Sequence, residues 1–231
     1  MKEIHKFLNS GPKIHAHEYQ IYSNLNWPNE CPWALLNGTS TENIIDNVFA
    51  PLAEQLPQTI FNLKRNCKDV FALLDNGEWY LVYQLQMGTQ KTRQIFIGGE
   101  SINQPKLSRE IQRNGWILPN DLVTFYRVHN GFGLLRPFDI FWLGDCVLPD
   151  YKLRLLSEIL PNVSDHELGY ETEDLLEFYP DGGGNGQYFY RSEIGKNVEL
   201  TVDWDHETRE LSHKQSFWRF VDKRLCNLIE R

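Results

Sequence analysis

The first part of the chain carries a helical pattern of apolar residues. Between residues 41 and 52 these residues recur every three or four positions, which predicts an amphipathic helix. Thr39 and Glu42 have the spacing of a capping box, and Pro51 stops or kinks the helix. Residues 1–38 are interrupted by prolines and predict extended or looping chain. The apolar face of the helix is formed by Ile44, Ile45, Val48, Phe49 and Leu52.

The pattern then changes to that of strands. Two runs rich in β-branched and aromatic residues flank Asn76-Gly77, which predicts a hairpin because both central positions of a type I′ turn need positive φ. A third run, KTRQIFIGG, follows Gly88. Residues 69–99 therefore predict a three-stranded antiparallel meander, and the polar residues 100–110 could form a linker.

A helical pattern returns after Trp116. Pro119 suits the first position of a helix, where no amide hydrogen bond is lost, and Gly131 can take the left-handed conformation that ends it. Leu122, Phe125, Tyr126 and His129 share one side of this helix.

The remaining residues predict further short elements. An apolar run at 138–149 precedes two short helices at 151–160 and 170–178, and strands return between 182 and 205. Ser216 caps a final helix, whose apolar stripe is Phe217, Val221, Leu225 and Leu228. These elements together predict an α+β fold, in which helices flank a mixed, mostly antiparallel sheet and the C-terminal helix packs on it.

The distribution of charge narrows the classes of partner. Residues 111–231 hold 20 acidic and 13 basic residues, a balance of −7, whereas residues 1–110 hold 11 and 10. An acidic half argues against nucleic-acid binding, which needs clustered Lys and Arg, and is compatible with docking a basic protein. No stretch approaches the roughly 18 apolar residues that span a bilayer, so we expect no membrane partner.

The N-terminus and the cysteines indicate a compartment. The N-terminus lacks the apolar run and cleavage site of a secretory signal. The cysteines are scattered without a C-x-x-C pair, which favours reduced thiols in the cytoplasm over a disulfide framework or a metal site.

Residues 115–223 contain four short motifs in order: a Leu-Pro helix ending in an Asn-Gly turn, a Gly-rich loop before a strand, a Trp-Asp-His turn and a Ser-Phe helix. The motif residues are Leu118, Pro119, Asp121, Phe125, Asn130 and Gly131; Asp181, Gly182, Gly183, Gly184 and Asn185; Trp204, Asp205 and His206; and Ser216, Phe217 and Phe220. This combination resembles the SUKH superfamily, the Smi/Knr-type family of fungal cell-wall-synthesis regulators and bacterial toxin-immunity proteins. The sequence departs from the family pattern at Arg209, where a Gly often stands.

The resemblance covers about half the chain and divides it in two. Residues 111–231 would form a SUKH-like domain, and residues 1–110 an N-terminal extension or subdomain assigned to no family. The resemblance implies a non-catalytic protein, most simply a bacterial immunity protein that binds and neutralises a toxin domain, without cofactor or metal. A regulatory scaffold of cell-wall synthesis or signalling is the second hypothesis.

The Gly-rich loop in YPDGGGNGQYFY suggests a phosphate-binding loop, but its context does not support one. A P-loop needs Lys and Ser or Thr followed by a helix, whereas Gly186 is followed by a strand-like run. The interpretation that remains is a turn in which glycines take positive φ and Asp181 and Asn185 bond nearby amides. A binding loop is the alternative.

Two further patterns could carry chemistry. Asp203 and Asp205 point to one face of a strand and, with His206 and Asp181, could ligate a metal in a hydrolase. No second ligand cluster supports a metal, so we expect a strand end in which Asp205 and His206 shape a turn. His129 could act as a general base, but no nucleophile accompanies it, so we expect a buried or capping histidine.

The segment SDHELGYETEDLLEFYPD contains seven acids and no Lys or Arg. It could be a solvated helix face or an electrostatic surface that docks a basic partner. The candidate partner-binding residues are Asp165, Glu167, Glu171, Glu173, Asp174, Glu177 and Asp181.

Overall fold

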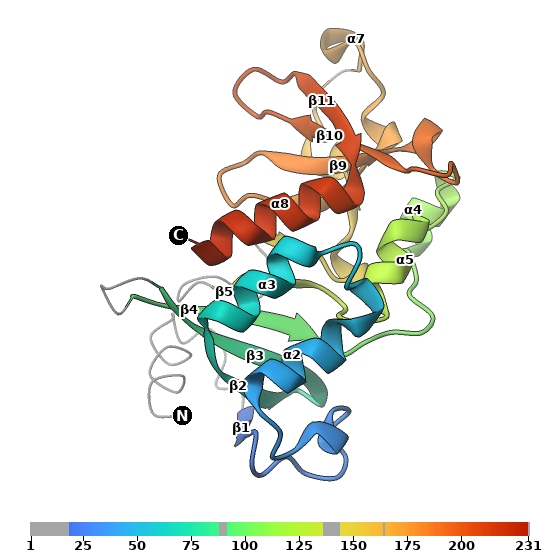
Figure 1. Ribbon diagram of the computed structural model, residues 1–231. Helices are drawn as coiled ribbons and strands as arrows, with labels where there is room; N and C mark the ends of the chain where they lie inside the picture. The colour runs from blue at the N-terminus through green and yellow to red at the C-terminus, as the bar shows by residue number, and fades with distance from the viewer. Residues whose placement is uncertain (1–18, 88–91, 136–143, 164, 231) are drawn as a thin grey trace.

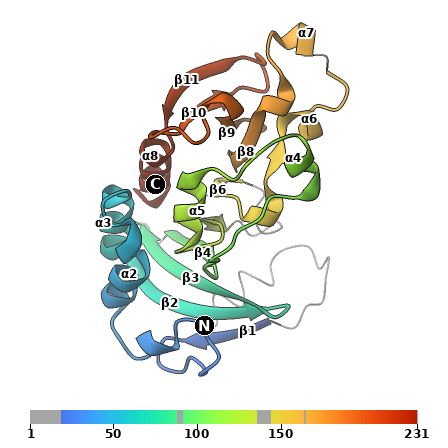
Figure 2. The same ribbon diagram turned by 90° about the vertical axis from the view of Figure 1, so that its right-hand side faces the viewer.

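Two antiparallel sheets organise the protein, as the computed structural model in Figures 1 and 2 shows; it describes residues 19–87, 92–135, 144–163 and 165–230. The first sheet has the order β1 (Tyr19–Ser23), β2 (Cys67–Asp75), β3 (Glu78–Met87), β4 (Thr92–Gly99), β5 (Phe132–Leu135) and β6 (Cys146–Val147). The second has the order β11 (Leu211–Ser216), β10 (Leu200–Trp204), β9 (Gly186–Tyr190), β8 (Leu175–Pro180) and β7 (Arg154–Leu155). The predicted α+β class is confirmed, with the strands divided between two sheets.

Backbone hydrogen bonds connect the two sheets between β6 and β8. The N–H of Asp145 donates to the carbonyl of Pro180 at 2.8 Å, and the N–H of Leu148 donates to that of Phe178 at 2.8 Å. The segment around β6 therefore belongs to the first sheet through β5 and touches the second through β8.

The predicted hairpin and meander are confirmed. Asn76 and Gly77 have φ of 51° and 83°, as a type I′ turn requires, and they join β2 to β3, which pairs with β4. Of the extended or looping chain expected before residue 38, Tyr19–Ser23 is extended. This segment is strand β1, because β2 offers it a free edge along its whole length.

The helices cover the sheets and begin close to their predicted starts. The N-cap of α2 is Ser40 rather than Thr39: the Ser40 side chain accepts the N–H of Asn43, and Thr39 instead donates to the Leu36 carbonyl. Pro119 is the N-cap of α5 rather than its first helical residue. The helices are α2 (Thr41–Phe49), α3 (Pro57–Asn66), α4 (Arg109–Arg113), α5 (Asn120–Tyr126), α6 (Leu156–Ile159), α7 (Asp165–Leu168) and α8 (Phe217–Glu230); the 3-10 turns are η1 (Ala34–Leu36), η2 (Ala50–Leu52), η3 (Asp150–Lys152), η4 (Thr172–Asp174) and η5 (Arg191–Glu193).

Helices from both parts of the chain pack on one another. Helices α2, α3 and α8 line one side of the molecule in Figure 2, and α3 contacts α8 extensively. The Ser216 cap is present, since its hydroxyl accepts the N–H of Arg219, and the predicted stripe of α8 is buried. Residues 100–110 are no free linker: Leu107 is buried, and the N–H of Ile102 donates to the Tyr126 carbonyl at 2.8 Å.

The helix predicted at 170–178 is wrong. This segment forms η4 and then β8, which lies between β7 and β9. Every residue of Leu175–Pro180 is buried, so both faces of the strand are covered and no alternation of polar and apolar residues marks it. At 151–160 the helix prediction holds only for α6, since β7 interrupts it. The apolar run at 138–149 lies partly outside the described residues and contains β6.

Candidate functional site

The Gly-rich loop and the Trp-Asp-His turn meet in space. The Asp181 carboxylate accepts the N–H of Gly183 at 2.7 Å and that of Asn185 at 3.1 Å. The Asn185 side-chain carbonyl accepts the backbone N–H of His206 at 2.9 Å and its ring Nδ1–H at 2.8 Å. Gly184 has φ of 106° and presses against the His206 ring, where a Cβ would come within 2.9 Å. The loop is thus the turn from β8 into β9 that its glycines predict.

Asp205, one of the possible metal ligands, already accepts hydrogen bonds from the backbone of its own turn. Asp205 accepts the N–H groups of Glu207 and Thr208, each at 2.9 Å. Arg209, at the position where the resembled family often has Gly, has φ of 59°, so it keeps a glycine-like conformation. No group of three or more His, Cys, Asp or Glu side chains in the described part of the chain could hold a metal ion.

The acidic segment does not form one continuous surface. Glu177 is buried in β8, ion-paired to Arg154 and bonded to the Tyr188 hydroxyl at 3.2 Å. Burial raises the pKa of Glu177, and Arg154 offsets part of the rise. Glu177 is therefore unsuitable for contact with a partner, because its side chain points from the strand into the interior of the protein.

The other acids of this segment divide into bonded and exposed groups. Asp165 in α7, which also carries Glu167, accepts the N–H and hydroxyl of Thr172 at 3.0 and 2.8 Å, and these bonds lower the pKa of Asp165. Asp174 is ion-paired to Arg191, and Asp181 holds the Gly-rich loop. The exposed acids between them are Glu171 and Glu173.

His129 is a core histidine. It is fully buried, with Nε2 2.8 Å from the Tyr83 hydroxyl and Nδ1 2.9 Å from the Gly99 carbonyl. The carbonyl can only accept, so Nδ1 carries the proton and Nε2 accepts from Tyr83. Burial lowers the pKa of His129 to about 4. The buried histidine expected from the sequence is confirmed.

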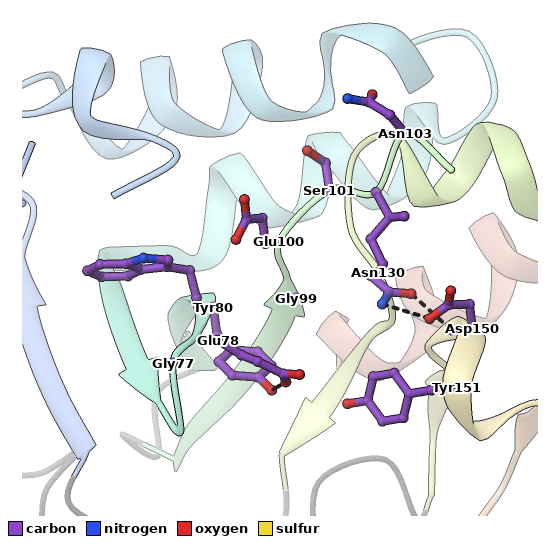
Figure 3. A pocket seen from close by; sticks show the side chains of 12 residues that line it. Gly77, Glu78, Tyr80, Gly99, Glu100, Ser101, Asn103, Asn130, Asp150 and Tyr151 are labelled. Carbon is purple, nitrogen blue, oxygen red and sulfur yellow. Dashed lines mark hydrogen bonds between the residues drawn. The ribbon is translucent and has the colours of Figure 1, made fainter. Parts of the chain in front are cut away.

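A pocket of about 450 Å³ opens at the end of the first sheet, and we call it the Tyr151 pocket (Figure 3). One wall comes from the start of β3, the opposite wall from the chain around Asn130 and η3, and the residues just after β4 lie between them. Its lining residues are Gly77, Glu78, Trp79, Tyr80, Gly99, Glu100, Ser101, Ile102, Asn103, Asn130, Asp150 and Tyr151.

Hydrogen bonds hold the walls of the Tyr151 pocket. The Tyr80 hydroxyl donates to Glu78 at 2.5 Å. The Asn130 amide donates to Asp150 at 3.1 Å and accepts the Asp150 N–H at 2.9 Å, as the dashed lines of Figure 3 mark. Asn130 is thus a motif residue that shapes the pocket.

The Tyr151 pocket is acidic and aromatic. Its lining includes three carboxylates, three aromatic side chains and, among the described residues, no Lys or Arg. Partial burial raises the pKa of Glu100, because it removes water from one side of the carboxylate. Tyr151, 53% exposed, forms the outer lip. Such a lining suits an ammonium or guanidinium group.

A second pocket of about 280 Å³ lies between α8, the second sheet and the Gly-rich loop, and we call it the Gln187 pocket. The candidate residues Asp181, Asn185 and Asp205 border it, together with Asp203 and Gln187. The structure thus brings together the Gly-rich loop and the Asp-Trp-Asp segment.

Sequence reasoning missed the Tyr151 pocket. Its only local signal is the i, i+2 spacing of Glu78 and Tyr80 after the Asn-Gly turn, which puts both on one face of β3. Glu100 and Tyr151 reach the same place only through the pairing of β3 with β4 and the return of the chain at η3.

Comparison with family models, with curated proteins and with solved structures gives no match in any of the three. Among the described residues, no helix has the length and apolar character needed to cross a membrane. All four cysteines are buried, and none forms a disulfide.

Proposed function

We propose that this chain is a non-catalytic interaction protein that binds a basic protein partner through the Tyr151 pocket. The lining of this pocket is the observation that carries the proposal. Glu78, Glu100 and Asp150 are among the residues that line it, together with three aromatic residues, and no Lys or Arg lines it among the described residues. A cationic side chain entering it gains charge-assisted hydrogen bonds and cation–π contact.

The resemblance to the SUKH superfamily supports a more specific version of the proposal. In that version the chain is a bacterial immunity protein in the cytoplasm, and the partner is a toxin domain whose active site is covered on binding. The balance of −7 over residues 111–231 supports steering of a basic partner. The exposed Glu171 and Glu173 are part of this balance.

The test is capture of partners from lysate of the source by the full chain and by charge variants. Glu100→Lys reverses the charge of a residue in the lining of the pocket. Glu54→Lys is the matched control, because Glu54 is exposed and lines neither pocket. We expect the parent and Glu54→Lys chains to capture one basic protein at near-equal stoichiometry, and Glu100→Lys to reduce capture at least tenfold.

A second readout addresses neutralisation. When the captured protein is expressed alone it should arrest growth, and co-expression of the parent chain should restore growth while Glu100→Lys should not. Capture that is equal for all three chains would refute the Tyr151 pocket as the contact. Recovery of kinases or wall-synthesis enzymes instead of a toxin would refute the immunity version and favour a regulatory scaffold.

A further inference from the structure

A row of polar side chains crosses the second sheet beside α8. In the strand register Tyr179 on β8 stands opposite Gln187 on β9, Gln187 opposite Asp203 on β10, and Asp203 opposite Ser212 on β11. Residues directly opposite one another in antiparallel strands project to the same face. All four line the Gln187 pocket, and α8 closes one side of it with Phe220 and Arg224.

The side-chain carbonyl of Gln187 is a buried acceptor without a partner. Gln187 is 1% exposed, and its Nε2 donates to the Thr201 hydroxyl oxygen at 2.9 Å. That hydroxyl donates its proton to the Gln215 carbonyl at 3.2 Å, so its oxygen must accept from Gln187. This chain of bonds fixes the orientation of the amide and leaves Oε1 unpaired. A buried acceptor in this state destabilises a fold unless water or a ligand supplies a donor.

The charges around this acceptor favour a cation. Asp203 neighbours Gln187 on the next strand, and Asp181 and Asp205 lie at the border of the same pocket. The one cation that lines the pocket among the described residues is Arg224, which is bonded to the buried Asp145 at 2.6 Å. Three carboxylates against one paired guanidinium leave the pocket negative.

We propose that the Gln187 pocket binds a guanidinium group, presented as an arginine side chain of the partner. A guanidinium offers several N–H donors in one plane, so it can donate to Gln187 Oε1 and to the neighbouring Asp203 at the same time. An ammonium lacks this fixed fork. The ring of Phe220 on the α8 side offers a flat apolar surface for the planar cation. The assignment of the ligand to the partner rests on the proposed function, whereas the pocket can be tested without a partner.

The experiment is a titration of the full chain with agmatine, a small guanidinium compound, followed by ¹⁵N NMR. We expect saturable shifts of the Gln187 side-chain amide and the Asp203 backbone amide. 1,4-Diaminobutane, which carries an ammonium instead, should bind at least fivefold more weakly. Gln187→Met removes the acceptor at similar volume and should raise the Kd for agmatine at least tenfold. Gln58→Met, at an exposed position of α3, is the matched control and should leave it unchanged.

Gln187→Glu provides a second test of the proposed site if Gln187→Met fails to fold. It retains the acceptor, adds a negative charge and should lower the Kd at least threefold. Absence of saturable shifts, equal binding of the two amines, or a Kd unaffected by Gln187→Met and Gln187→Glu would each overturn the inference. If agmatine does not bind while Glu100→Lys still reduces capture of the partner, only the inference about the Gln187 pocket is refuted. If agmatine binds while Glu100→Lys captures as much partner as the parent chain, the proposed contact through the Tyr151 pocket is refuted instead.

Discussion

Asp222 in α8 caps the N-terminus of α3 through Thr59, a residue 163 positions earlier in the chain. Its carboxylate accepts the N–H of Thr59 at 2.8 Å and that of Gln58 at 3.3 Å, and the Thr59 hydroxyl donates to the Asp222 carbonyl at 3.2 Å. The first turn of a helix leaves such N–H groups without intrahelical partners, and its dipole favours a negative charge there. The C-terminal helix therefore completes a helix of the N-terminal part.

Replacing Asp222 by Ala should lower the free energy of unfolding by about 3 kcal/mol, because charge-assisted bonds are lost and buried amides are left unpaired. Urea denaturation measures this loss as a lower midpoint. Lys223→Ala changes an exposed neighbour in the same helix and should stay within about 0.5 kcal/mol of the parent. Equal midpoints for Asp222→Ala and the parent would show that the cap contributes nothing.

His129 should make the protein less stable in mild acid. The folded chain keeps its imidazole neutral down to a pKa of about 4, whereas the unfolded chain takes up a proton near pH 6.5. The unfolded state therefore binds more protons between these values, and the contribution of His129 to stability falls as pH decreases from 6.5 to 4, by roughly 3 kcal/mol in total. His129→Gln retains a donor and an acceptor without titrating, so its unfolding free energy should show a flatter pH dependence. Parallel curves would contradict the prediction.

Asp121 should give the opposite pH dependence. Burial raises its pKa to about 6, the nearby Glu199 adds to the rise, and the bond from the Trp218 indole opposes it. The folded state holds the proton between pH 4 and 6 while the unfolded state has lost it, so this contribution to stability declines as pH rises through that range. The indole N–H resonance of Trp218 should titrate with a midpoint near pH 6, and Asp121→Asn should abolish the step. A midpoint near pH 4 would contradict it.

Gly184→Ala should destabilise the protein by about 1–3 kcal/mol, since its φ of 106° is unfavourable for a side chain and the new Cβ meets His206. Gly183→Ala is the matched control, because a Cβ there lies 3.4 Å or more from its neighbours. Thermal denaturation of both variants measures the difference. Equal melting temperatures would show that the loop adapts freely.

The elements that the sequence predicts well are those with local causes. The hairpin follows from Asn76-Gly77, whose conformational freedom suffices to set the turn. The last helix follows from its Ser216 cap and its apolar stripe. The Gly-rich turn follows from Asp181, which bonds to the amides of Gly183 and Asn185, whereas the Asn185 side chain bonds to the distant His206 and not to a nearby amide.

The elements that it predicts poorly depend on partners far along the chain. β8 resembles a helix in sequence, and only burial between β7 and β9 and the pairing of Glu177 with Arg154 show it to be a strand. The acidic segment therefore loses Glu177 from its surface. The Tyr151 pocket combines four segments that are far apart in the sequence, so no pattern of spacing reveals the whole pocket.

The short segment from Asp145 to Asp150 also sets a distance. At one end Asp145 holds Arg224 of the Gln187 pocket, and at the other Asp150 stands in the wall of the Tyr151 pocket. Five residue steps of extended chain measure roughly 17 Å at most. Two basic side chains on one rigid partner would have to match this spacing to enter both pockets, and their joint binding would then gain from effective concentration. If one partner used both proposed pockets, this segment would limit how far apart its two basic side chains could be.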